Sequence, residues 1–105
     1  MDIELLVVPD CPHEAGAAEL LRTALDDVGL GASGVAVDVV HSQEEAEARY
    51  FVGSPTFCLD GADVFPEPDQ PAALACRLYP GARGVPELRD LRQALKRAAA
   101  ASMTR

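Results

Sequence analysis

Apolar and polar positions along the chain follow two different periods. Residues 3–8 form a short apolar run rich in branched side chains, which predicts a buried strand. From His13 to Val28 the apolar residues recur every three or four positions, which is typical of an amphipathic helix. Pro12 suits the first position of this helix, and Gly29 or Gly31 suits its end. The chain is therefore predicted to open with a strand and a helix.

The middle of the chain repeats this order and then predicts a hairpin. Residues 35–40 predict a second strand, and the capping-box pattern SQEE opens a short helix over residues 42–50. The runs 55–59 and 62–65 flank Asp60-Gly61, which is a strong signal for a tight turn between two strands.

The last third of the chain predicts two more helices. Prolines between residues 66 and 71 mark a loop. Leu74 and Leu78 are four residues apart, which favours a short helix over residues 72–79, although an extended run also fits. Pro86 opens a final helix with one apolar stripe and a basic face turned to water. The stripe consists of Leu88, Leu91, Leu95 and Ala98, and the basic face of Arg89, Arg92, Lys96 and Arg97.

Apart from the ambiguous segment 72–79, these elements follow the order β-α-β-α-β-β-α. Strands that alternate with helices indicate parallel pairing through helical crossovers, and the hairpin adds an antiparallel pair. We therefore predict an α/β fold with a mixed four-stranded sheet and helices on both faces. A chain of 105 residues suits one domain over residues 1–105.

Composition and charge narrow the class of protein. Hydrophobic residues make up 49% of the chain and charged residues 25%, which is typical of a globular protein. Residues 1–69 hold 15 acids against two arginines, and only the last helix is basic, so nucleic acid is not an expected partner. No run has the length of a membrane span, and the start of the chain lacks the pattern of a secretory signal. We expect a cytoplasmic protein with no membrane partner.

The chain has three cysteines, at positions 11, 58 and 76. An odd number does not suit a disulfide scaffold, and their wide spacing does not suit a structural zinc site. Cys58 lies inside a predicted strand and is interpreted as core packing. Cys76 is a candidate reactive thiol if its sulfur comes close to that of Cys11, and otherwise it is also core.

Cys11 is the strongest candidate for chemistry. It lies where the first strand ends and the helix opened by Pro12 begins. Free backbone N–H groups and the positive end of the helix dipole would stabilise a thiolate there, and the thiolate is the reactive form. Asp10 and Glu14 oppose this effect, whereas a protonated His13 would support it. We favour a functional thiol over a buried structural cysteine.

The motif Gly53-Ser54-Pro55-Thr56 is the second candidate. A proline cannot donate to a strand ladder, so Pro55 either begins the hairpin strand or follows a cis peptide bond.

Together these features resemble the thioredoxin-like superfamily: a first strand, a Cys-Pro element before a helix, Ser-Pro-Thr before a hairpin, and a last amphipathic helix. The resemblance implies a thioredoxin-like fold in which Cys11 is the nucleophile and Pro55 is cis and packs against it. Thioredoxins carry a second cysteine three residues after the first, and here that position is Glu14. The partner of Cys11 would therefore be Cys76 or an external thiol.

A narrower resemblance concerns "VGSPTFCLDGADVFP" and "ACRLYPG" before the last helix. In these stretches the chain is similar to small thioredoxin-like proteins often labelled alkylmercury lyase. By this resemblance Cys11 and Cys76 would hold Hg(II) as a substrate metal, and Glu14 would protonate the departing carbon. Thiolates are soft ligands and select soft metals, so the chemistry is coherent.

Three hypotheses follow. The first is thiol–disulfide exchange by Cys11, with a thiol or disulfide compound as partner. The second is organomercurial or soft-metal chemistry with Cys11, Cys76 and Glu14, and the third is a non-catalytic module that binds a partner beside Pro55. Whether the protein is an enzyme stays open, and no cofactor is expected. The residues expected to contact a substrate are Pro12, His13, Ser54, Pro55 and Thr56.

Overall fold

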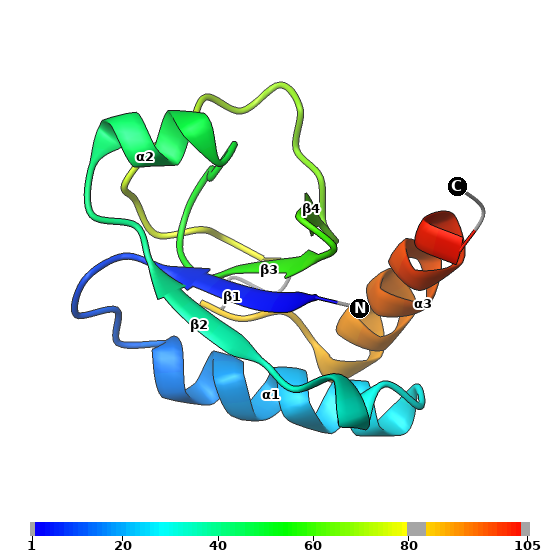
Figure 1. The fold of residues 1–105 in the computed structure, drawn as a ribbon. Coiled ribbons are helices and arrows are strands. Elements are labelled where there is room, and N and C mark those ends of the chain that lie inside the picture. The colour runs from blue at the N-terminus through cyan, green and yellow to red at the C-terminus, as the bar shows by residue number, and fades with distance from the viewer. Residues whose placement is uncertain (1, 80–83, 104–105) are drawn as a thin grey trace.

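A computed structural model describes residues 2–79 and 84–103 of the chain. The predicted order of strands and helices is confirmed, with one additional 3₁₀ turn before the second strand (Figure 1). The elements are β1 (Ile3–Val7), α1 (Glu14–Asp27), η1 (Gly31–Ser33), β2 (Ala36–Val39), α2 (Gln43–Ala48), β3 (Thr56–Leu59), β4 (Ala62–Asp63) and α3 (Leu88–Met103).

The four strands form one mixed sheet in the order β2-β1-β3-β4. β1 pairs with β2 in parallel, which the crossover through α1 makes possible, and β3 is antiparallel to both β1 and β4. Asp60 and Gly61 join β3 to β4 with φ angles of 52° and 84°. Positive φ at both central residues suits a two-residue hairpin turn, so the turn predicted from Asp-Gly is confirmed.

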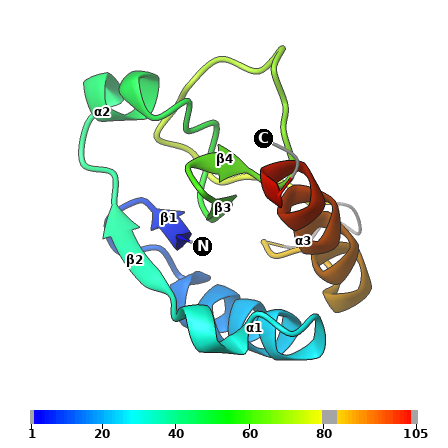
Figure 2. The same ribbon diagram turned by 45° about the vertical axis from the view of Figure 1, so that its right-hand side comes forward.

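One face of the sheet is apolar and packs against α1 and α3 (Figures 1 and 2). Alternate residues of a strand point to opposite faces, and Leu5, Val7, Phe57 and Leu59 all point to this one. The helices cover them with fully buried leucines. These leucines are Leu21 and Leu25 from α1 and Leu91 and Leu95 from α3.

The opposite face is smaller and partly polar. Leu6 and Cys58 pack there against Ala46 of α2 and against Phe51, which follows α2. Figure 1 shows α2 across the sheet from α1, which confirms helices on both faces. Ser42 caps α2 as predicted, because its hydroxyl accepts a hydrogen bond from the Glu45 N–H at 3.1 Å.

The start of α1 corrects one prediction. The helix begins at Glu14 with His13 as the capping residue, and Pro12 is not its first helical residue. The Glu14 N–H bonds to the Cys11 carbonyl at 3.3 Å, which closes a separate turn before the helix. Cys11 therefore lies two residues before the helix cap, further from the free N–H groups of the first turn than we expected.

Residues 72–79 correct a second prediction, because they are extended and not helical. We call this segment the strap. It runs beside residues 51–55 and is held there by backbone hydrogen bonds from Ala73 N–H to Phe51 C=O, from Ser54 N–H to Ala75 C=O and from Arg77 N–H to Ser54 C=O. These partners lie more than twenty positions away in sequence, so the spacing of Leu74 and Leu78 could not reveal them.

The C-terminal helix agrees with its predicted stripe, although it begins at Leu88 and not at Pro86. Leu91 and Leu95 are buried, and Arg89, Lys96 and Arg97 are exposed. Arg92 is only half-exposed and forms an ion pair with Asp27 of α1 at 3.1 Å. Every helix among residues 2–79 and 84–103 is too short or too polar to span a membrane.

Candidate thiol site

The Cys11 sulfur receives a hydrogen bond from a buried serine. The Ser54 hydroxyl lies 3.1 Å from Cys11 Sγ and is placed to donate to it. The same oxygen accepts a hydrogen bond from the Val8 N–H at 3.1 Å. Because the oxygen accepts from Val8, its proton is directed at the sulfur. Ser54 is 1% exposed and Cys11 is half-buried, so this contact is shielded from water on the serine side.

The sheet brings these distant residues together. Cys11 follows β1 and Ser54 precedes β3, and the two strands are antiparallel neighbours with Leu6 opposite Thr56. The end of one strand and the start of the other therefore meet at the same edge of the sheet. The Ser54-Pro55 peptide bond is cis, as the resemblance to thioredoxins implied.

The strap brings Cys76 beside Ser54. The Ser54 N–H bonds to the Ala75 carbonyl at 2.8 Å, and its carbonyl accepts from the Arg77 N–H at 2.9 Å, which makes Cys76 its direct neighbour in a parallel bridge. The backbone of Cys76 is thus the bridge partner of Ser54, whose hydroxyl contacts Cys11. Cys76 is exposed, and both thiols are free.

Arg77 anchors the strap in the protein. It is 3% exposed, and one guanidinium nitrogen lies 2.7 Å from Asp63 Oδ2 and 3.2 Å from the Thr56 hydroxyl. The other terminal nitrogen donates to the Phe65 carbonyl. Burial raises the pKa of Asp63, and the charge of Arg77 opposes that rise. The strap is therefore tied to the β3–β4 hairpin by a buried ion pair.

Tyr79 is the second anchor of the strap. Its hydroxyl donates to the Pro55 carbonyl, and its ring packs edge-on against Phe57 and Phe65. The guanidinium carbon of Arg77 lies 5.0 Å from the centre of this ring, within the range of a cation–π contact. Burial raises the pKa of the Tyr79 hydroxyl.

Gly53 permits the close approach of the strap. Its φ angle is +153°, and a Cβ atom at this position would lie 2.9 Å from Cβ of Arg77 and 3.1 Å from its backbone. A side chain at residue 53 would therefore push the strap away from Ser54.

The remaining candidate residues are less directly connected to the thiols. Glu14 is half-buried, and its carboxylate has no hydrogen bond or ion pair within residues 2–79 and 84–103. The His13 ring packs on Gly84, where a Cβ atom would lie 2.3 Å from Nε2. Pro12 is exposed, whereas Pro55 and Thr56 are buried. The Thr56 hydroxyl is already engaged, because it donates to the Gly53 carbonyl at 2.6 Å.

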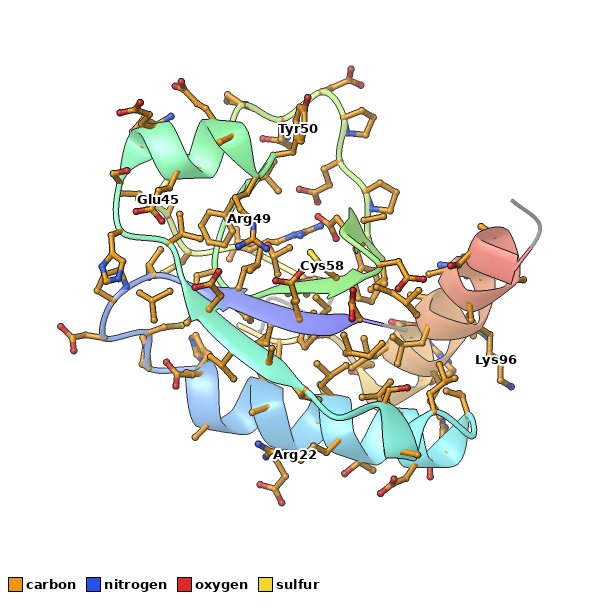
Figure 3. All side chains as sticks on the ribbon, in the orientation of Figure 1. Arg22, Glu45, Arg49, Tyr50, Cys58 and Lys96 are labelled. Atoms are coloured by element: carbon orange, nitrogen blue, oxygen red, sulfur yellow. The ribbon has the colours of Figure 1, made fainter. Side chains whose placement is uncertain are left out.

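Cys58 is a core residue, as predicted. It is 5% exposed, and burial raises the pKa of its thiol from 9.0 to about 12. Figure 3 shows Cys58 and Arg49 on the side of the sheet that α2 covers. His41 is exposed.

Within the described part of the chain, no three histidine, cysteine or acidic side chains gather closely enough to hold a metal ion. A soft metal at this site would therefore depend on the two sulfurs of Cys11 and Cys76 alone.

The sequence analysis missed Arg77, Asp63 and Tyr79. The strap was interpreted as a helix, and no local pattern indicates that a charged residue in it is buried. A strand alternation would not have found them either, because the alternating apolar residues Leu74, Cys76 and Leu78 are exposed while Arg77 and Tyr79 are buried.

Comparison of the chain with models of protein families, with curated protein sequences and with solved structures gives no match. The function must therefore be argued from the geometry of the site.

Proposed function

We propose that the chain is a thioredoxin-like thiol protein in which Cys11 carries out thiol–disulfide exchange and Cys76 resolves the intermediate. The observation that carries this proposal is the position of Ser54, which donates its hydroxyl proton to Cys11 and pairs its backbone with the residues around Cys76. A hydrogen-bond donor at the sulfur stabilises the thiolate, the form that attacks a disulfide.

The arrangement of the fold supports the same proposal. A β2-β1-β3-β4 sheet, helices on both faces and a cis proline beside a cysteine together resemble the thioredoxin-like fold. The departure is the second cysteine, since Glu14 stands three residues after Cys11. Cys76, which lies in the strap and not in the helix, takes the role of the second cysteine.

The reaction balances with a small disulfide as the oxidant. The Cys11 thiolate attacks one sulfur of the disulfide, forms a mixed disulfide and releases the first thiolate of the reagent. The Cys76 thiolate then attacks Cys11 Sγ, forms the Cys11–Cys76 bond and releases the second thiolate. The protein loses two electrons and the disulfide gains them.

Single-cysteine variants test this proposal. Cys11→Ser is expected to abolish turnover of a small disulfide in the presence of a reducing thiol, followed by absorbance of the released product. Cys76→Ser is expected to retain the first attack and to accumulate the mixed disulfide, which mass spectrometry detects as an added half-reagent. Cys58→Ala serves as the control and should match the wild type. Equal turnover by Cys11→Ser and the wild type would refute the proposal.

A second candidate is soft-metal chemistry with the same thiols, favoured because Ser54 contacts the Cys11 sulfur and is the bridge partner of Cys76. Two thiolates suit a soft ion such as Hg(II). The organomercurial mechanism also needs Glu14 as a proton donor. Among the described residues, no hydrogen bond or ion pair connects Glu14 to the thiols. Metal binding by the two thiols is therefore better supported than cleavage of an organomercurial. Titration with Hg(II) should then saturate at one ion per chain and lose that stoichiometry in Cys76→Ser.

A further inference from the structure

Arg77 is a charged residue in an unusual place. The strap exposes Leu74, Cys76 and Leu78, so little of its middle is held by apolar burial. At its centre a guanidinium is almost fully buried, and its Nε has no hydrogen-bond partner. Nε lies 3.9 Å from Glu67 Oε2. Burying a charge costs desolvation free energy, and an ion pair with hydrogen bonds can fail to offset that cost fully.

A second arginine on the same face of the sheet provides a comparison. Arg49 contacts Asp38 at 2.6 Å and Glu4 at 2.9 Å, so it also bridges two groups. Its side chain is 33% exposed, against 2% for Arg77, and its partners belong to β1 and β2, away from the strap. Arg49 has the surroundings of an ordinary surface ion pair, whereas Arg77 does not.

The contacts of Arg77 hold the strap at the residue next to Cys76. Its backbone N–H bonds to the Ser54 carbonyl, and its side chain bonds to Asp63, Thr56 and the Phe65 carbonyl. The residue therefore joins the strap at once to Ser54 and to the hairpin. Cys76 is the preceding residue in the chain, and on its other side the Ala75 carbonyl accepts a hydrogen bond from the Ser54 N–H.

We infer that Arg77 is a positioning residue of the thiol site: its ion pair with Asp63 holds the strap so that Cys76 stays beside Ser54 and its sulfur reaches Cys11. This inference rests on the proposed function. It assigns Arg77 to the second chemical step alone, in which the Cys76 thiolate attacks Cys11 Sγ and displaces the thiolate of the reagent. The first attack by Cys11 depends on the Ser54 hydroxyl at its sulfur and not on the position of Cys76.

The two steps can be separated with an aromatic disulfide, dithiobis(nitrobenzoate), used in less than one equivalent. Each reagent molecule releases one coloured thiolate when a protein thiol attacks it. It releases a second when the other thiol closes the intramolecular disulfide, and this second rate does not depend on reagent concentration. Because positioning governs the rate of an intramolecular step, Arg77→Met is expected to slow closure about tenfold or more. The first release should change by less than about twofold, since Cys11 and Ser54 remain in place.

Two further variants keep the test decisive. Arg77→Lys retains the charge and should recover part of the closure rate. Asp63→Asn keeps an oxygen for the Phe65 N–H and removes the charge that pairs with Arg77, so it should slow closure about threefold even if Arg77→Met fails to fold. Arg49→Met is the matched control and should leave both releases unchanged.

The outcomes separate the two proposals. If the wild type shows no second release, the proposed function fails, and the role of Arg77 fails with it. A wild type that closes normally, with folded Arg77→Met or Asp63→Asn closing at the same rate, overturns the inference alone. Equal slowing of both releases would show that Arg77 supports the fold in general and would also overturn it.

Discussion

Cys11 lies in the loop after β1 and Cys58 in the middle of β3, and the two thiols have opposite surroundings. Cys11 is half-buried and receives a hydrogen bond from the Ser54 hydroxyl. Cys58 is buried, and it pairs across the sheet with Glu4 on one side and Asp63 on the other. Burial raises the pKa of Cys58 first, and these two carboxylates raise it further.

The comparison shows that the position in the sheet decides the chemistry of each thiol. A strand interior removes a thiol from water and from reagents. A loop at the end of a strand leaves the sulfur open and lets a neighbouring strand supply a hydrogen-bond donor. Loops held by a rigid sheet are common locations for functional residues for this reason.

The largest expected difference is in the rate of alkylation. A thiol with a pKa of about 12 holds roughly one thiolate in ten thousand molecules at pH 8, and Cys58 is also closed to reagents. We expect iodoacetamide to modify Cys58 at least about a thousandfold more slowly than Cys11 in the folded protein. Peptide mass spectrometry against time measures both rates in one sample. In urea the two rates should converge, and comparable rates in the folded protein would remove the basis of the comparison.

The next effect is on the pH dependence of stability. Because the folded state raises the pKa of Cys58 from 9.0 to about 12, the folded protein keeps a proton that the unfolded chain releases. The stabilisation is complete below about pH 9 and is lost as the pH rises toward 12, at about 1.4 kcal/mol per pH unit. Tyr79, whose pKa burial also raises, adds a loss of the same sign at higher pH.

Urea denaturation at pH 8 and at pH 10.5 measures this effect. Cys58→Ala removes the thiol and should lose less stability between the two pH values than the wild type does, although it is less stable at both. Cys76→Ala, at an exposed thiol, is the matched control and should follow the wild type. If the stability of Cys58→Ala depends on pH as that of the wild type does, the loss of stability at high pH does not come from Cys58.

The smallest expected effect concerns the hydroxyl of Ser54. Ser54→Ala removes the donor to Cys11, and a hydrogen bond to a charged group contributes about 1.5–3 kcal/mol when buried. Cys11 is only half-buried, so we expect its reaction with a small disulfide at pH 7 to slow about threefold to tenfold. Ser42→Ala is the control, because that hydroxyl also accepts a backbone N–H but lies at the cap of α2. If the two variants react alike, Ser54 does not assist Cys11.

The sequence predicted most of the fold because the spacing of apolar residues differs between strands and helices and can be read locally. The apolar run of β1 and the helical spacing of α1 and α3 are local properties, and the Asp-Gly turn fixes the hairpin. Cys11 and Ser54 could be singled out from their places beside prolines. Their contact could not be derived locally, because it depends on β1 and β3 lying side by side.

The strap could not be predicted for the same reason. Its extended shape depends on hydrogen bonds to Phe51 and Ser54, and its buried Arg77 depends on Asp63 in the hairpin. Leu74 and Leu78 suggested a helix because they are four residues apart, yet they are also an even number apart, as side chains on one face of a strand are. Only the three-dimensional contacts distinguish these two interpretations.

The central claim is that Cys11 and Cys76 act as a pair, and disulfide mapping after mild oxidation tests it most directly. The folded protein would be oxidised with one equivalent of a small disulfide, blocked with an alkylating reagent and digested without reduction. We predict one linked peptide pair joining Cys11 to Cys76, with Cys58 recovered unmodified in the folded state. Recovery of Cys11 as a stable mixed disulfide, with Cys76 alkylated separately, would contradict the account.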